Sequence, residues 1–238
     1  MAMPEITTAP SFYATARGAV AARLLRERLL ELWPSLAGQH VLGIGFAAPY
    51  LRLWREQAYR CVAAVPVQAG EWRWPRHRPC LSCAALDDAL PFPDLSFDRV
   101  LVVHGLETSE NARRMLREAW RVLKDDGRLL LVVPNRTGLW AHLETTPFGH
   151  GQPYTAGQIE RLLSANLFRV ERRDTALFVP PLQWRLVLRA APLMERTGRK
   201  VMPSLAGLTL TEAVKDVYAA VPTATAPVKR RLVLADPV

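Results

Sequence analysis

The chain has few cysteines, no long apolar run and no signal-like N-terminus. Its three cysteines, an odd number among 238 residues, are typical of a reducing compartment rather than of a disulfide-braced domain. No apolar stretch is long enough to span a bilayer. The N-terminus lacks a charged region followed by an apolar stretch and a small-residue cleavage site. These absences argue against a secreted or membrane-spanning protein and predict a cytoplasmic location.

The sequence also lacks any block of like charges, although its net charge is +9 and its pI is about 10.1. Most of the positive charge is arginine, spread along the chain and interleaved with aspartate and glutamate. This pattern is typical of solvated faces with a mild preference for anionic partners. It argues against dedicated nucleic-acid binding.

Residues 182–200 combine apolar and basic side chains at helical spacing. Such a segment is compatible with an anionic membrane surface or with docking of a protein partner. The favoured interpretation is a helix that covers a sheet, because Pro192 interrupts a single straight amphipathic helix. Membrane-surface contact is therefore not favoured, and a protein partner stays open.

Apolar segments of strand length alternate with segments of helical periodicity along the chain. Several predicted strands are apolar throughout, which is typical of a mostly parallel sheet covered on both faces. We therefore predict an α/β domain over residues 35–218, preceded by a helical extension over 1–34 and followed by a mobile tail over 219–238. The predicted strands span residues 41–44, 60–65, 81–86, 98–103, 128–133, 168–178 and 205–214. The predicted helices span residues 11–33, 50–57, 109–123 and 156–165, with a further helix inside 180–200.

The stretch VLGIGFAAP, residues 41–49, follows the helical extension. It reads as a buried strand that runs into a tight turn and then into a helix. In a doubly wound α/β domain, the first such turn is where a nucleotide-like cofactor meets backbone N–H groups. The sequence therefore places a candidate cofactor site at this turn.

Two further runs carry a family resemblance. They are ALPFPDLSFDRV at residues 89–100 and LREAWRVLKDDGRL at residues 116–129. In order and spacing they are similar to the A-L-P-F-P-D-x-S-F-D-x-V and E-x-x-R-V-L-K-P-G-G-x-L runs of the class I S-adenosylmethionine-dependent methyltransferases, most closely the type 11 group. The resemblance covers residues 35–178 and implies a Rossmann-like, doubly wound, seven-stranded sheet whose final strand is antiparallel. It also implies S-adenosylmethionine bound across the carboxyl ends of strands one to four.

The first loop departs from the family's pattern of apolar-acid-apolar-Gly-x-Gly-x-Gly. The acid position is Gly43, the first glycine is kept as Gly45, and the second and third glycines are replaced by Ala47 and Pro49. The acid that holds the ribose at the end of strand two is replaced by Pro66. Because a lost hydrogen bond to a charged group costs about 1.5–3 kcal/mol, these departures put the affinity for the cofactor in doubt.

The third polar anchor of the family is an aspartate after strand three. An ungapped match puts Leu86 at this position, with Asp87 and Asp88 directly after it. Either aspartate could take the role after a small shift. The cofactor-binding residues that the resemblance implies are Gly43, Gly45, Phe46, Ala47, Asp87, Asp88 and Leu90.

His104 follows the fourth strand, at the sheet edge where ligands of open α/β sheets bind. Imidazole can take up a proton near neutral pH, so His104 is a candidate general base. The alternative is a capping or buried structural histidine. Thr108 or Ser109 is expected as the N-cap of the next helix.

The segment 135–154 is long for a loop and rich in aromatic and polar side chains, which is typical of lids and binding loops. In the resembling family this region covers the substrate. Trp140 and Phe148, with Tyr154, are expected either as an aromatic wall or as a small core of the loop itself. The candidate substrate contacts are His142, His150 and Tyr154.

His77, Cys80 and Cys83 stand at a spacing that invites a zinc interpretation. Zinc requires four ligands, and no second ligand pair follows in the sequence. We therefore predict no metal site and assign both cysteines to packing.

The sequence supports two functions of different classes. In the first, the chain is an enzyme that transfers a methyl group from S-adenosylmethionine to a small-molecule acceptor, with His104 as the base. In the second, it keeps the fold without the cofactor and acts as a binding or regulatory subunit. The retained His104 and the long loop favour the enzyme, whereas the altered first loop and Pro66 favour the subunit.

Overall fold

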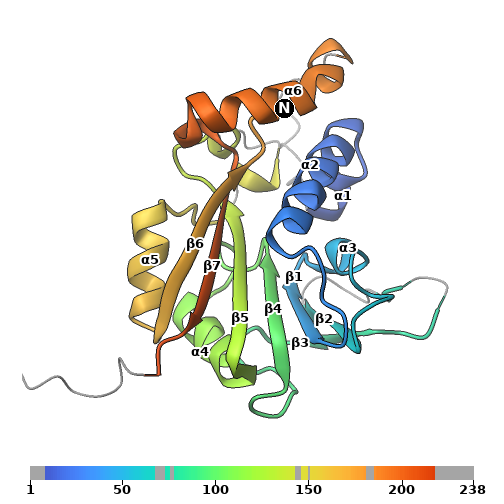
Figure 1. Cartoon of the computed structure of the whole chain (residues 1–238), viewed down its shortest axis with the longest axis vertical. Helices are drawn as coiled ribbons and strands as arrows, with labels where there is room; N and C mark the ends of the chain where they lie inside the picture. The colour runs from blue at the N-terminus through green and yellow to red at the C-terminus, as the bar shows by residue number, and fades with distance from the viewer. Residues whose placement is uncertain are drawn as a thin grey trace, which may run out of the picture.

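A computed structural model describes residues 9–67, 73–75, 78–142, 146–149, 151–180 and 185–217. Seven strands form one sheet in the order β3-β2-β1-β4-β5-β7-β6 (Figure 1). β1 to β5 pair in parallel, and β7 pairs antiparallel with both β5 and β6. This topology confirms the predicted doubly wound sheet with an antiparallel final strand. The strands are β1 (His40–Gly45), β2 (Arg60–Pro66), β3 (Ser82–Ala85), β4 (Phe97–Val103), β5 (Leu123–Pro134), β6 (Phe168–Ala176) and β7 (Leu208–Lys215).

Helices cover both faces of the sheet. Figure 1 shows α4 and α5 on one side and α1, α2 and α3 on the other. Each side has its own apolar cluster of buried side chains, as the alternation of apolar strands and amphipathic helices predicts. The helices are α1 (Ala9–Tyr13), α2 (Ala16–Leu32), α3 (Ala48–Leu51), α4 (Ala112–Val122), α5 (Ala156–Ser164) and α6 (Arg185–Val201). Short 3-10 turns span Leu139–His142, Pro147–Gly149 and Pro203–Leu205.

The N-terminal extension consists of two helices, where the sequence predicts one helix over residues 11–33. The first helix ends at Tyr13, and the Thr15 hydroxyl caps α2 by accepting a hydrogen bond from the Gly18 N–H at 3.0 Å. A side chain at Gly18 would lie 2.1 Å from the carbonyl oxygen of Phe12, so only glycine admits this close return. The break turns α1 so that Phe12 packs against Trp140 and Phe148.

Two other element boundaries differ from the prediction for visible reasons. β5 begins at Leu123 instead of residue 128, because Leu123 pairs with Phe97 before the register shifts at Arg99. β6 ends at Ala176 instead of residue 178, because the next two amide groups donate to the Glu195 carboxylate of α6 at 2.9 and 2.8 Å. The predicted helix over 50–57 is a single turn, α3, followed by irregular turns.

α6 packs against α2 and β6, in agreement with the predicted covering helix. Arg199 of α6 lies 3.2 Å from Glu31 of α2. The segment 182–184 and the predicted tail lie outside the described residues. In the described part of the chain, no helix has the length and apolar character needed to cross a membrane.

The two family-like runs are fastened to each other by charged hydrogen bonds. Glu118 of α4 accepts the backbone N–H of Leu90 at 2.8 Å. Arg121 donates to the carbonyl oxygens of Phe92 and Leu90 at 2.8 and 3.0 Å and pairs with Asp94 at 2.7 Å. Hydrogen bonds from Arg121 are the main cause of a lowered Glu118 pKa. The spacing between the two runs is thus the spacing that lets α4 hold the loop before β4.

We predict that Arg121→Ala lowers the free energy of unfolding by about 2 kcal/mol, since it removes several hydrogen bonds that involve charged groups. Arg117→Ala, an exposed position on the same helix, is the control and should change stability by less than about 0.5 kcal/mol. Urea unfolding measures both. Equal effects of the two substitutions would show that the hydrogen bonds of Arg121 contribute nothing to stability.

The hydrogen bonds between Glu118 and Arg121 also predict a pH dependence of stability. Because the folded-state pKa of Glu118 is lowered, its contribution to stability is present above the ordinary glutamate pKa and is lost as the pH falls through the lowered value. Glu118→Gln should therefore flatten the loss of stability at acid pH, as measured by unfolding between about pH 3 and 6. An acid limb identical to that of the unmodified protein would contradict this assignment.

Candidate functional site

The turn at Gly45 joins the ends of β1 and β4. Gly45 has a φ of +71°, in the left-handed region. A side chain there would lie 2.7 Å from the carbonyl oxygen of Val103 and 3.0 Å from Cα of Gly105. The N–H of Phe46 donates to the same Val103 carbonyl at 2.7 Å. Both the conformation and the close approach require glycine here, so this glycine sets the geometry of the sheet edge.

Positions 43 and 47 face the same space under the turn. A Cβ atom on Gly43 would lie 2.8 Å from Cβ of Ala47 and 2.8 Å from Cδ1 of Leu51. Ala47 and Leu51 are fully buried in the core against this face of β1. A side chain at 43 and a methyl group at 47 therefore compete for the same space. The family pattern has an acid at position 43 and a glycine at position 47. Here glycine stands at 43 and alanine at 47, so the methyl group of Ala47 occupies the space that a side chain at 43 would fill.

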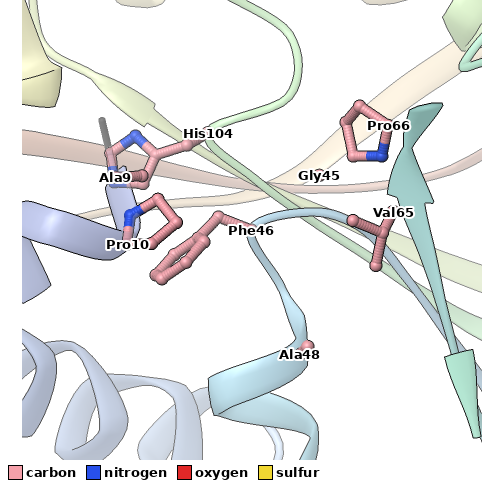
Figure 2. Close-up of a pocket in the computed structure, with 8 residues that line it drawn as sticks. All are labelled: Ala9, Pro10, Gly45, Phe46, Ala48, Val65, Pro66 and His104. Carbon is pink, nitrogen blue, oxygen red and sulfur yellow. The ribbon is translucent and has the colours of Figure 1, made fainter. Parts of the chain in front are cut away.

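Two adjoining pockets open at the carboxyl edge of the sheet. Gly45 and Pro66 line both of them. Figure 2 shows the smaller pocket, with Pro10 and His104 on one side, Val65 and Pro66 on the other, and the turn of Gly45 and Phe46 between them. The larger pocket has a volume of about 660 Å³. It is lined by Ile44, Gly45, Pro66, Leu86, Asp87, Asp88, Gly105, Thr108, Glu110, Asn111 and Arg114.

Four of the seven predicted cofactor residues line this crevice. Gly45 and Phe46 line the small pocket, and Asp87 and Asp88 line the large one. Asp88 lies 3.6 Å from Arg114. The other three predicted residues line neither pocket: Gly43 and Ala47 lie in β1 and under the turn, and Leu90 is buried in the core with its N–H bonded to Glu118.

His104 is the centre of a buried chain of hydrogen bonds. Its Nε2 lies 2.9 Å from the Tyr13 hydroxyl, and its Nδ1 lies 2.8 Å from Oε1 of Glu107. Burial, then the neighbouring Tyr50 and the charge of Glu107, raise the pKa of Tyr13 well above its ordinary value. The phenol therefore stays protonated and donates to Nε2, while Nδ1–H donates to the carboxylate. The three side chains form a Tyr–His–Glu relay.

The relay is rigidly held. His104 has a φ of +49°, a conformation that costs a non-glycine residue on the order of 1 kcal/mol. Its ring packs edge-to-face on Phe148 at 5.1 Å. The Glu107 side chain is buried, and its Oε2 has no hydrogen-bond partner in the described part of the chain. A strained backbone and an incompletely paired buried carboxylate are features that proteins retain at functional sites.

The sequence missed two members of this relay. Tyr13 lies 91 positions before His104, and a side chain in a predicted helix carries no sign of such a contact. Glu107 follows His104 by three positions at the end of a strand. That spacing could have predicted a contact between the two side chains. The expected N-cap at Thr108 or Ser109 is wrong, because Asn111 caps α4 by accepting from the Arg114 N–H at 3.1 Å.

The loop after β5 contributes packing at the same place. Trp140 and Phe148 are buried together with Phe12, and Trp140 donates its ring N–H to the Val179 carbonyl at 2.8 Å. They therefore belong to the main core and not to a separate core of the loop. Tyr154 is half-buried, and its pKa is raised by burial and then by the charge of Glu107. The side chain of His142 and the whole of His150 lie outside the described residues.

The cysteines do not form a ligand cluster. Cys80 is exposed, so its assignment to packing is wrong, whereas Cys83 is half-buried and packs against the core. Cys61 is buried, which raises the pKa of its thiol to about 11. His77 lies outside the described residues. Among the residues that are described, no three His, Cys, Asp or Glu side chains gather as metal ligands.

The shared space under the turn predicts a coupling between positions 43 and 47. Gly43→Ala alone should lower the free energy of unfolding by about 1–3 kcal/mol through overpacking. In the double variant Gly43→Ala, Ala47→Gly, the loss should be smaller than the sum of the single effects by about 1 kcal/mol. Chemical unfolding of the unmodified chain, Gly43→Ala, Ala47→Gly and the double variant measures these effects. Additive effects would mean that the two positions do not share this space.

The sequence matches a known domain family. Residues 35–131 match the family model described as a methyltransferase domain. An uncharacterized protein of Mycobacterium tuberculosis is 33% identical over 123 residues, which are 49% of this chain and 43% of that protein. The match thus spans less than half the length of this curated relative.

Solved structures show the same fold. A chain of the Haloferax volcanii Trm112 methyltransferase activator complex has a TM-score of 0.60 at 16% identity, covering 90% of this chain and 99% of that chain. An S-adenosylmethionine-dependent methyltransferase of Thermotoga maritima has a TM-score of 0.57 at 17% identity, covering 83% and 90%. Together with the strand order, these similarities show that the chain has the fold of these structures, and residues 35–131 are similar to a methyltransferase domain.

Proposed function

We propose that this protein transfers a methyl group from S-adenosylmethionine to a small-molecule acceptor. The observation that carries the proposal is the buried Tyr13–His104–Glu107 relay, which lies directly beside the Gly45 turn. A family fold alone does not establish activity. A strained histidine between a phenol and a buried carboxylate, at the edge where ligands bind, is an arrangement suited to proton transfer.

The large pocket fits the nucleoside half of the cofactor. Asp87, Asp88 and Asn111 offer oxygen acceptors and an amide to ribose hydroxyls and to the adenine amino group. The pocket is also large enough for a nucleoside. Pro66 supplies no acceptor at the end of β2, so these three side chains would hold the nucleoside in place of the missing acid.

The charge balance of the site also suits a cationic cofactor. Glu107 is buried with one carboxylate oxygen unpartnered within the described residues, and a buried charge is costly without compensation. A positively charged group in the crevice would compensate this charge over short distances in a low-dielectric site. Bound S-adenosylmethionine supplies such a group, together with an electrophilic methyl carbon.

The relay would activate the acceptor. The acceptor's proton passes to the Tyr13 oxygen as the Tyr13 proton passes to Nε2 of His104. The resulting imidazolium is stabilised by the Glu107 carboxylate on Nδ1. Phe12 packs against Tyr13, and Phe148 packs against His104. Positioning of the acceptor by this enclosed site contributes the remaining part of catalysis.

The altered cofactor-binding positions also support a second function. Pro66 and the filled space at Gly43 remove two acids that the family pattern would supply. A chain that binds no cofactor would act as a binding or regulatory subunit, and one structural neighbour comes from a complex with an activator protein. The retained relay favours the enzyme over this subunit.

Turnover tests the proposal. We expect the purified chain to release S-adenosylhomocysteine from S-adenosylmethionine in the presence of a mixture of small phenols and carboxylic acids. Tyr13→Phe and His104→Gln should each lower this rate by about 10²- to 10⁴-fold. Tyr59→Phe, an exposed tyrosine, is the control. Relay variants that match the control would rule out the relay, and a silent unmodified protein would favour the subunit.

Binding tests the placement of the cofactor. Pro66→Asp restores a carboxylate at the β2 end of the crevice and should tighten S-adenosylhomocysteine binding by about tenfold, the worth of one hydrogen bond to a charged group. Val67→Asp is the matched control, because Val67 is the next residue and is 53% exposed. Calorimetry measures both. Unchanged affinity in Pro66→Asp would mean that the nucleoside does not lie at this strand end.

A further inference from the structure

A further pocket lies on the other side of the Tyr13–Phe46 pair. The two rings stack at 5.0 Å with an interplanar angle of 13°. This pocket has a volume of about 340 Å³ and shares Pro10 and Phe46 with the small pocket of the crevice. Its walls come from α1, α2 and the start of α3. It is lined by Pro10, Tyr13, Ala14, Ala19, Ala22, Arg26, Phe46, Pro49 and Tyr50.

Tyr50 lines this pocket with an unsatisfied hydroxyl. The residue is fully buried, and within the described residues its hydroxyl has no hydrogen-bond partner. The hydroxyl of the neighbouring Tyr13 donates its hydrogen bond to Nε2 of His104. Buried polar atoms are almost always paired, so a buried hydroxyl without a partner beside a pocket indicates a missing acceptor.

Arg26 brings a positive charge to the wall of this pocket. The guanidinium carbon of Arg26 lies 5.9 Å from the centre of the Tyr50 ring. The pKa of Arg26 is lowered by burial and then by the like charge of Arg52. The Nε of Arg26 is buried, and no described residue is its hydrogen-bond partner. In the part of the chain described here, no carboxylate pairs with Arg26, although most other buried or half-buried arginines have such a partner.

We propose that this pocket binds the carboxylate of a small molecule. Arg26 supplies the positive charge, and the Tyr50 hydroxyl supplies a neutral donor. A carboxylate pairs with the guanidinium and satisfies the hydroxyl in one step. The remaining walls are proline, alanine and aromatic side chains, so they accept an apolar or aromatic body attached to the carboxylate.

The proposal deepens the proposed function and rests on it only for the origin of the carboxylate. Tyr13 belongs both to this pocket and to the relay. A methyl acceptor with a carboxylate on Arg26 would therefore meet the relay through Tyr13. The amino-acid end of the methyl donor is the other source of a carboxylate. Both sources share the same recognition chemistry, and binding experiments separate them.

Benzoate tests the site without any cofactor, and benzamide is its neutral counterpart of the same shape. We expect benzoate to bind the unmodified chain about tenfold more tightly than benzamide, as followed by NMR titration. Arg26→Gln should weaken benzoate binding by about tenfold. Arg23→Gln is the control, since it removes the same charge from α2 at an exposed position. Equal binding of benzoate and benzamide, or equal effects of the two substitutions, overturns the proposal.

Tyr50→Phe keeps the test decisive if Arg26→Gln fails to fold. It removes only the unpartnered hydroxyl, so the fold should keep its stability, while benzoate binding weakens by about threefold or more. Unchanged benzoate affinity in Tyr50→Phe would overturn the assigned role of this hydroxyl.

S-adenosylhomocysteine and 5′-methylthioadenosine identify the source, because the second lacks the carboxylate. If Arg26→Gln weakens binding of the first compound alone, the carboxylate is that of the donor. If Arg26→Gln affects neither compound and benzoate binds together with S-adenosylhomocysteine, the carboxylate is that of the acceptor. Failure of both nucleosides to bind the unmodified chain would refute the proposed function, and the benzoate result would still decide on the anion pocket.

Discussion

The close approach of β1 to β4 at Gly45 is the contact on which the site depends. A side chain there would strike the Val103 carbonyl and the Gly105 backbone. The approach brings the first turn next to the residues that follow β4. It therefore sets the crevice that Gly45 lines on both sides, and it fixes His104 relative to the turn. Only glycine combines this contact with the left-handed backbone conformation at position 45.

The N-terminal helices give the site its chemistry. α1 brings Tyr13 to His104 and to Phe46, and it returns over the sheet because Gly18 admits the backbone of Phe12. The relay therefore joins a segment at the start of the chain to the end of β4. A buried network of this kind has a high cost when it is incompletely paired, as it is at Oε2 of Glu107 within the described residues. The same two helices enclose the pocket of Arg26 and Tyr50, which places an anion site beside the relay.

Much of the fold follows from the sequence, and the site follows in part. The runs at 89–100 and 116–129 predict the loop before β4, α4 and β5, since each is local and held by Glu118 and Arg121. The break between α1 and α2 was not predictable from periodicity, because the apolar spacing continues through it and the break depends on Gly18 admitting the Phe12 carbonyl. Tyr13 escaped prediction because its partner, His104, lies 91 positions along the chain. The sequence shows the residues at positions 43 and 47 as two separate departures from the family pattern. The structure shows that their side chains would share one space.

The central claim is that a cofactor lies across the Gly45 turn beside the relay. A crystal structure of the chain with S-adenosylhomocysteine tests it most directly. The account predicts the nucleoside in the pocket of Asp87 and Asp88 and the sulfur on the side of Tyr13 and His104. A nucleoside bound away from Gly45, or a crevice without ligand at saturating concentration, would contradict the account.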